Sequence, residues 1–263
     1  MNFKSKLRSI IGEGLGLCIG LDPVLDRLPK KVRNSREPLY AFNREIIEHT
    51  YDIAAAYKLN LAFYEALGCD GWRQLEMTIS DISDECLVIA DGKRGDIGST
   101  AKAYAASLFD TLKVDAATVN PYLGSDALEP FLDRTDHGAF ILAVTSNPGS
   151  RDLQELVCDG EQLFHYVVRM ACRLNKSGNV GLVVGATKPE LWRDVMDIAV
   201  DLPLLVPGIG AQGGDLAALK SALQDYSAPV LVNASRSIIY ASSGDDFGRA
   251  AREAAQSLND QLS

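Results

Sequence analysis

The chain has 263 residues, of which 47% are hydrophobic and 23% are charged, and its formal net charge is -9. This composition is typical of a globular protein with enough apolar material for one sizeable core, and the negative charge disfavours nucleic acid and anionic membrane surfaces as partners. The sequence contains no apolar run of the roughly 18 residues that a membrane-spanning helix needs, so we expect neither a membrane nor a nucleic-acid partner.

The segment 3–11 is predicted to form a short helix before the first strand. Glu13 and the glycines around it interrupt the apolar core that a signal peptide would need. The five cysteines are scattered, with no C-x-x-C pair and no His at ligand spacing, which indicates reduced, mostly packed thiols and no metal site. These features together predict a cytoplasmic protein.

Apolar, β-branched runs alternate with longer segments of helical period along the whole chain. Eight runs are predicted strands: 16–23, 55–63, 86–94, 116–122, 138–147, 180–187, 203–210 and 228–236. The predicted helices include 39–54, 99–112, 161–175, 188–199, 215–224 and 245–262. Eight βα units in about 250 residues are typical of a closed (β/α)8 barrel. We therefore predict one barrel domain over residues 1–263, with an open doubly wound sheet as the alternative.

The predicted strands end in polar side chains although their interiors are apolar. The residues at these ends are Asp22, Lys58, Asp91, Lys93, Ser146, Gln212 and Arg236. Barrel enzymes carry their chemistry at the C-terminal ends of the strands. We therefore expect these side chains to surround one site.

The strongest local motif is DGKRGDIGST, residues 91–100, at the end of the third predicted strand. Side chains alternate along a strand, so Asp91 and Lys93 point to the same side. Lys58 ends the neighbouring second strand, and Asp96 follows shortly after Lys93, which suggests an alternating Lys, Asp, Lys, Asp array. A structural ion-pair ladder at the barrel mouth is the alternative interpretation.

The later predicted strands end in segments with further candidate ligand-binding residues. The segment 206–215, VPGIGAQGGD, is rich in glycine, and loops after strands seven and eight commonly bind phosphate in this barrel. Arg236 supplies a forked donor for a dianion, with Gln212 as a neutral partner. GIGAQG also matches G-x-G-x-x-G, but it lies near the chain end and Asp225 precedes its strand, unlike a dinucleotide site. A plain tight turn stays the alternative for the glycines.

Ser146, at the end of the fifth predicted strand, either contacts a planar heterocycle or caps a turn.

The motifs GLDP, DGKRGDIGSTAKAYA, VPGIGAQGGD and NASRS follow in this order along the chain. They resemble the orotidine 5'-monophosphate decarboxylase family, specifically its type 2 branch. Gly92 departs from the family, which favours Ala there, but it faces away from the predicted site. The resemblance implies decarboxylation of orotidine 5'-monophosphate (OMP) to UMP in de novo pyrimidine biosynthesis. It also implies that the enzyme needs no cofactor and no metal.

The resemblance also implies the roles of individual residues. Asp91 would lie against the substrate carboxylate while Lys93 protonates C6 as CO2 leaves, and Lys58 and Asp96 would complete the catalytic set. Asp22 and Lys58 would bind the ribose. The implied substrate-binding residues are Asp22, Ile97, Thr100, Ser146 at the pyrimidine, Pro207, and Gln212, Gly213 and Arg236 at the phosphate. The loop GAQGGD, residues 210–215, would act as a lid.

The resemblance further implies a homodimer in which Asp96, Ile97 and Thr100 reach the neighbour's barrel. Two other functions stay open at this point. A Mg2+-dependent sugar-phosphate decarboxylase or aldolase shares the D-x-K-x-x-D core, but it needs a carboxylate cluster, whereas here lysines flank the carboxylates. A non-catalytic nucleotide-binding regulator is disfavoured by the intact Asp91, Lys93 and Asp96, because a protein that only binds has no use for a like-charged group beside the substrate carboxylate.

Overall fold

The computed structural model describes residues 2–12, 14–209 and 215–262. Eight parallel strands close into a barrel in the order β1, β10, β9, β8, β5, β4, β3, β2. These strands are β1 (Leu15–Gly20), β2 (Ala56–Asn60), β3 (Leu87–Arg94), β4 (Ala116–Val119), β5 (Gly138–Val144), β8 (Val180–Val184), β9 (Leu204–Pro207) and β10 (Val230–Ala234). The closed (β/α)8 barrel is confirmed, and the open doubly wound sheet is excluded.

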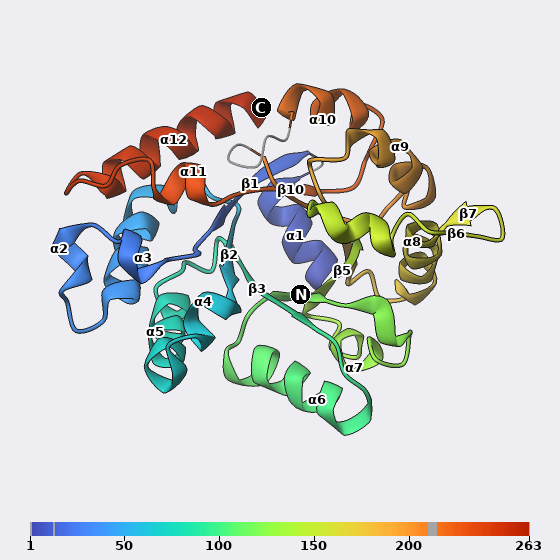
Figure 1. Cartoon of the computed structure of the whole chain (residues 1–263), viewed down its shortest axis with the longest axis horizontal. Helices are drawn as coiled ribbons and strands as arrows, with labels where there is room; N and C mark the ends of the chain where they lie inside the picture. The colour runs from blue at the N-terminus through green and yellow to red at the C-terminus, as the bar shows by residue number, and fades with distance from the viewer. Residues whose placement is uncertain (1, 13, 210–214, 263) are drawn as a thin grey trace.

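Helices surround the ring of strands, and α1 lies across its middle (Figure 1). They are α1 (Phe3–Ile11), α2 (Lys30–Arg33), α3 (Pro38–Thr50), α4 (Leu61–Glu65), α5 (Gly68–Ser80), α6 (Gly98–Ala106), α7 (Glu129–Leu132), α8 (Leu163–Leu174), α9 (Pro189–Ile198), α10 (Leu216–Ala222), α11 (Arg236–Ile239) and α12 (Phe247–Leu262). Within the described ranges, no helix is long and apolar enough to cross a membrane.

Several local features differ from the predictions, and every barrel strand except β3 ends two or three residues before its predicted end. The second strand ends at Asn60 instead of residue 63, because the Asn60 side chain accepts a hydrogen bond from the Ala62 N–H and starts α4. A small antiparallel hairpin, β6 (Val157–Cys158) and β7 (Glu161–Gln162), lies between β5 and α8 and was not predicted. The helix predicted over 99–112 is α-helical only to Ala106 and continues as a π-helical turn.

The cysteines also differ in part from the prediction. All five are free thiols, but only Cys18 and Cys86 are buried, whereas Cys69, Cys158 and Cys172 are exposed. The expectation that most of them are packed is therefore wrong, because these three lie on outer faces of α5, the hairpin and α8.

The barrel interior is apolar at its N-terminal end. Its buried residues are Cys18, Ala56, Leu87, Ile89, Ala116, Phe140, Val183, Leu205 and Leu231, packed against Phe3 and Leu7 of α1. Because side chains alternate along a strand, the next inward positions are Lys58 after Ala56, Asp91 after Ile89 and Thr118 after Ala116. The same face of each strand is therefore apolar at one end and polar at the other.

Helix α1 closes the N-terminal end of the barrel. The Asn2 side chain accepts a hydrogen bond from the Ser5 N–H at 2.9 Å and begins the helix. The Phe3 ring is fully buried and meets Phe140 edge-on at 6.1 Å between centroids. A Cβ at Gly138 would lie 2.4 Å from the Phe3 ring, so the strand needs glycine there.

Candidate active site

A cavity of about 780 Å3 lies at the C-terminal ends of the barrel strands. Its described lining residues include five charged side chains, namely Asp22, Lys58, Asp91, Lys93 and Arg236. Ser146 and Pro207 line the same cavity. Charged groups that lie far apart in the sequence therefore line one cavity, as predicted from their positions at the ends of the strands.

The lysines and carboxylates alternate within this cavity. Lys58 Nζ donates to Asp91 Oδ2 at 2.9 Å, and Lys93 Nζ donates to Asp91 Oδ1 at 2.7 Å. Asp22 Oδ1 lies 4.0 Å from Lys58 Nζ. The order is thus Asp22, Lys58, Asp91, Lys93, which we call the ionic array.

Burial and neighbouring charge act in opposite directions on the ionic array. Burial alone would raise the pKa of the Asp91 carboxyl, but Lys58 and Lys93 hold that pKa well below its usual range. Burial would likewise lower the pKa of Lys58, but Asp22 and Asp91 raise it above its usual value. Asp91 is therefore ionised and Lys58 is protonated at neutral pH, and the buried charges compensate each other.

Lys93 differs from the other members of the array because its side chain is 49% exposed, against 10% for Asp91 and 5% for Lys58. Its backbone φ is +46°, in the left-handed region that disfavours residues with a Cβ. An exposed ammonium on a strained backbone, anchored by one buried carboxylate, can move a proton to or from a group in the cavity.

Asp96, Ile97 and Thr100 are not among the described residues that line this cavity. The Asp96 carboxylate accepts a hydrogen bond from the Ile97 N–H at 2.8 Å, and the Ile97 side chain is 58% exposed. Thr100 lies exposed in the first turn of α6. The structure therefore does not bring Asp96 into the ionic array of its own chain.

Of the remaining predicted ligands, Ser146, Pro207 and Arg236 line the cavity. The Ser146 carbonyl accepts a hydrogen bond from the Thr187 hydroxyl at 3.3 Å, which links the loops after β5 and β8. Arg236 is exposed at the start of α11. Gln212 and Gly213, and all of the expected lid except Asp215, lie outside the described residues.

The prediction that Gly92 faces away from the site is confirmed. A Cβ at this position would lie 2.8 Å from Cδ1 of Leu61 and 3.2 Å from Nε of Arg94, outside the barrel. Alanine would therefore require small shifts of the Leu61 and Arg94 side chains, and it would meet no group of the cavity.

Among the polar residues of the cavity that were not predicted from the sequence, three belong to barrel strands. They are Asn60, Thr118 and Asn233, and all three line the cavity. Asn60 lies two residues after Lys58, and Asn233 two residues after Leu231, on the inward face of their strands. The signal available in the sequence was a polar residue at an inward position of a buried strand.

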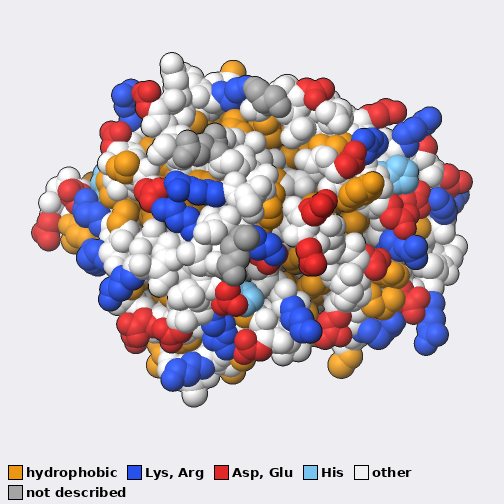
Figure 2. Space-filling view, turned by 180° about the vertical axis from the view of Figure 1, so that it is seen from behind, with side chains coloured by type: hydrophobic (Ala, Val, Ile, Leu, Met, Phe, Trp, Pro, Cys, Tyr) orange, Lys and Arg blue, Asp and Glu red, His pale blue; other side chains and the backbone are white. Residues whose placement is uncertain are grey.

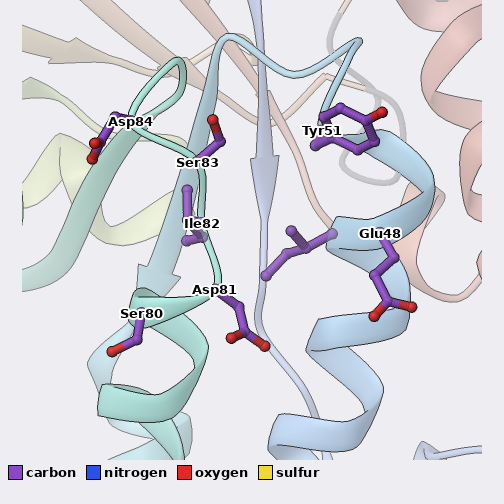
Figure 3. Close-up of a pocket in the computed structure, with 8 residues that line it drawn as sticks. Glu48, Tyr51, Ser80, Asp81, Ile82, Ser83 and Asp84 are labelled. Atoms are coloured by element: carbon purple, nitrogen blue, oxygen red, sulfur yellow. The ribbon is translucent and has the colours of Figure 1, made fainter.

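A second cavity, of about 520 Å3, lies between the end of α3 and the segment after α5 (Figure 3). Its lining includes the carboxylates of Glu48, Asp81 and Asp84, and no Lys or Arg among the residues described there. It lies on the N-terminal side of the strands, because the segment after α5 leads into β3. Three carboxylates repel an anionic ligand, so the first cavity is the better candidate for one.

The chain is similar to known proteins over nearly its whole length. A family model described as "Orotidine 5'-phosphate decarboxylase / HUMPS family" matches residues 16–253. The orotidine 5'-phosphate decarboxylase of Herpetosiphon aurantiacus is 50% identical over 244 residues, 92% of this chain and 90% of that protein. The OMP decarboxylase structure from Leishmania donovani has a TM-score of 0.83 and 36% identity, and the match covers 100% of this chain and 99% of that one. The UMP synthase structure from the same organism has a TM-score of 0.86 and 38% identity, but this chain spans only 56% of it. The chain therefore belongs to the orotidine 5'-phosphate decarboxylase / HUMPS family.

Proposed function

We propose that the chain decarboxylates OMP to UMP, as a cofactor-independent step of pyrimidine biosynthesis. The observation that carries the proposal is the ionic array, which places the exposed ammonium of Lys93 beside the buried carboxylate of Asp91, with 2.7 Å between the bonded atoms. The relatives that bear the name OMP decarboxylase support the same reaction.

The proposed chemistry follows from where charge develops. When the bond between C6 and the carboxylate breaks, CO2 leaves and the electron pair stays on C6 in the plane of the ring. A fixed positive charge at this position stabilises the developing carbanion. Lys93 Nζ supplies that charge and then gives its proton to C6, and the neutral amine regains a proton from solvent. Asp91 holds the ammonium in place and lies against the departing carboxylate.

The remaining groups of the cavity bind the rest of the nucleotide. Asp22 and Lys58 bind the ribose hydroxyls, Ser146 contacts the pyrimidine, and Arg236 binds the phosphate beside Pro207. In this proposal Gln212 and Gly213 contribute to the phosphate site. Binding energy from the remote phosphate holds the reacting ring in place, so its loss lowers the rate as well as the affinity.

Metal chemistry competes poorly at this site. The cavity carboxylates of Asp22 and Asp91 both face the Lys58 ammonium, and Asp91 also pairs with Lys93. A divalent cation would have to displace these ammonium groups from the carboxylate oxygens that it prefers. A sugar-phosphate enzyme that depends on Mg2+ is therefore the weaker assignment.

The active form in this proposal is a homodimer with sites shared between subunits. Large apolar side chains are exposed beside the end of β3, at Ile97 (58%), Tyr104 (36%), Tyr122 (75%) and Leu123 (47%). They follow the ends of the neighbouring strands β3 and β4, as does Asp96, which is not among the described residues that line the cavity of its own chain. Burial of this patch against a second copy would carry Asp96, Ile97 and Thr100 toward the partner's cavity.

Subunit exchange tests the shared site. Lys93→Ala and Asp96→Ala are each expected to be inactive, but a mixed dimer has one site with both lesions and one site with neither. Random pairing therefore returns activity to about a quarter of the wild type. If activity does not recover after subunit exchange has been demonstrated, the shared site is contradicted, whereas the proposed role of Lys93 is unaffected.

We also propose that the whole chain is one domain, that it acts in the cytoplasm and that it has no nucleic-acid partner. On the face seen in Figure 2, basic and acidic side chains are interspersed among the described residues, and they form no extended basic stripe there. Limited proteolysis, cell fractionation and a gel-shift assay test these three proposals.

An absorbance assay with OMP in the presence of EDTA tests the reaction itself. We expect turnover to UMP at the same rate with and without EDTA. Binding of UMP without turnover would indicate a regulator, and activity that EDTA abolishes would indicate a metal-dependent member of the superfamily.

A further inference from the structure

We infer that Thr118 is a positioning residue for the proposed decarboxylation. Its hydroxyl group links the Asp91 carboxylate to the backbone of Lys93 and thereby holds the Lys93 ammonium where it meets the substrate. The inference rests on the proposed function and adds a residue on a strand that contributes no other polar side chain to the ionic array.

Thr118 lies on the inward face of β4 and is 1% exposed. Its Oγ1 accepts a hydrogen bond from the Lys93 N–H at 3.0 Å and donates one to Asp91 Oδ1 at 2.8 Å. A hydroxyl group has one hydrogen to donate and lone pairs to accept with. Both capacities are used here, within the same short segment of β3.

The register between β3 and β4 explains why the hydroxyl is needed. Ala90 pairs with Ala117 and Arg94 pairs with Val119, so the three residues 91–93 lie opposite Thr118 alone. Such an irregularity interrupts the ladder and redirects side chains. At this point the Lys93 N–H donates to the Thr118 hydroxyl, which takes the place of a backbone carbonyl of β4.

The same irregularity gives Lys93 its left-handed backbone, with φ at +46°. A non-glycine residue keeps this conformation only where surrounding contacts impose it. The hydrogen bond from the Lys93 N–H to Thr118 is such a contact. The bond from Thr118 to Asp91 Oδ1 fixes the carboxylate, which also accepts from Lys58 and Lys93.

Thr118→Val keeps the shape of the side chain and removes only the hydroxyl group. We expect kcat for OMP to fall by about 30- to 100-fold, because a displacement of the proton donor by about 1 Å costs that order of rate. The affinity for UMP, measured by titration calorimetry, is expected to stay within about 3-fold, because the phosphate contacts are remote.

Thr118→Ser supplies the rescue, since it restores the hydroxyl, and we expect kcat within about 5-fold of the wild type. Thr50→Val is the matched control, because it also removes a buried hydroxyl with two partners, the Ile46 carbonyl at 2.7 Å and the Tyr57 hydroxyl at 2.8 Å, none of which lines the cavity. Should the valine variant fail to fold, Thr118→Ser and Thr118→Ala form a second pair that lacks the methyl group in both members and differs only in the hydroxyl.

The inference is overturned if Thr118→Val keeps more than about a third of kcat, if serine is no better than valine or alanine, or if UMP affinity falls as much as kcat. Wild-type protein that fails to turn over OMP contradicts the proposed function instead. The two failures are therefore distinguishable within one set of assays.

Discussion

Lys58→Met is expected to destabilise the fold strongly, because Lys58 compensates two carboxylates from a buried position. Its side chain is 5% exposed, and its ammonium lies 2.9 Å from Asp91 and 4.0 Å from Asp22. A pair of unit charges at about 4 Å attracts with about 4 kcal/mol at an effective dielectric of about 20. Removal of one partner of a buried pair costs about 3–5 kcal/mol, because the other charge is left buried without full compensation. We therefore expect Lys58→Met to lower the free energy of unfolding by this amount at pH 7.

The loss also depends on pH in a defined direction. The folded pKa of Asp91 is depressed, so its contribution to stability is fully present above the unfolded value of about 3.9 and is lost as the pH falls through the folded value. Without Lys58 the folded pKa of Asp91 rises, because one of its two cations is gone. The stability difference between wild type and Lys58→Met is therefore largest at neutral pH and shrinks as the pH falls below about 4.

Urea denaturation at fixed protein concentration measures both effects. The matched control is Lys31→Met, which removes a lysine that pairs with Glu45 on the surface at 2.8 Å. This substitution is expected to lower the free energy of unfolding by at most about 1 kcal/mol. A loss below about 1 kcal/mol for Lys58→Met, or an equal loss at pH 3 and pH 7, would refute the reasoning.

Three further predictions concern separate parts of the molecule. Arg236→Ala is expected to weaken UMP binding by at least about tenfold, because it removes the proposed charge-assisted contact with the phosphate; unchanged affinity by calorimetry would place the phosphate elsewhere. Gly92→Ala is expected to keep kcat within about 3-fold, since its Cβ meets only the ends of Leu61 and Arg94. Phe3→Ala is expected to lower the unfolding free energy by about 3–5 kcal/mol with kcat per folded enzyme unchanged, because Phe3 fills the end of the barrel opposite the cavity; a fall in kcat would argue against that separation.

The barrel could be predicted because its signals are local and repeated. Each strand is a short apolar run, and the polar residues at the ends of these runs are themselves visible in the sequence. Alternation along the third strand predicts that Asp91 and Lys93 lie together, and the distance of 2.7 Å between Lys93 Nζ and Asp91 Oδ1 confirms it, although the backbone at Lys93 departs from a regular strand.

Other features could not be predicted from the sequence because they depend on tertiary structure. The β6–β7 hairpin has two residues in each strand, and most of them are exposed, so it carries no apolar pattern. Thr118 is a β-branched residue in an apolar run, where threonine suits a strand for reasons unrelated to a site. Its role depends on the register shift between β3 and β4, which no residue of either strand specifies alone.

Lys93→Ala tests the central claim most directly, because it removes the proposed proton donor and leaves the remote phosphate site intact. The measurement is kcat for OMP beside the affinity for UMP in the same preparation. We predict that decarboxylation is abolished while UMP still binds. Retention of even about a tenth of the wild-type kcat, equivalent to about 1.4 kcal/mol of barrier, would contradict the assignment of Lys93 as the acid.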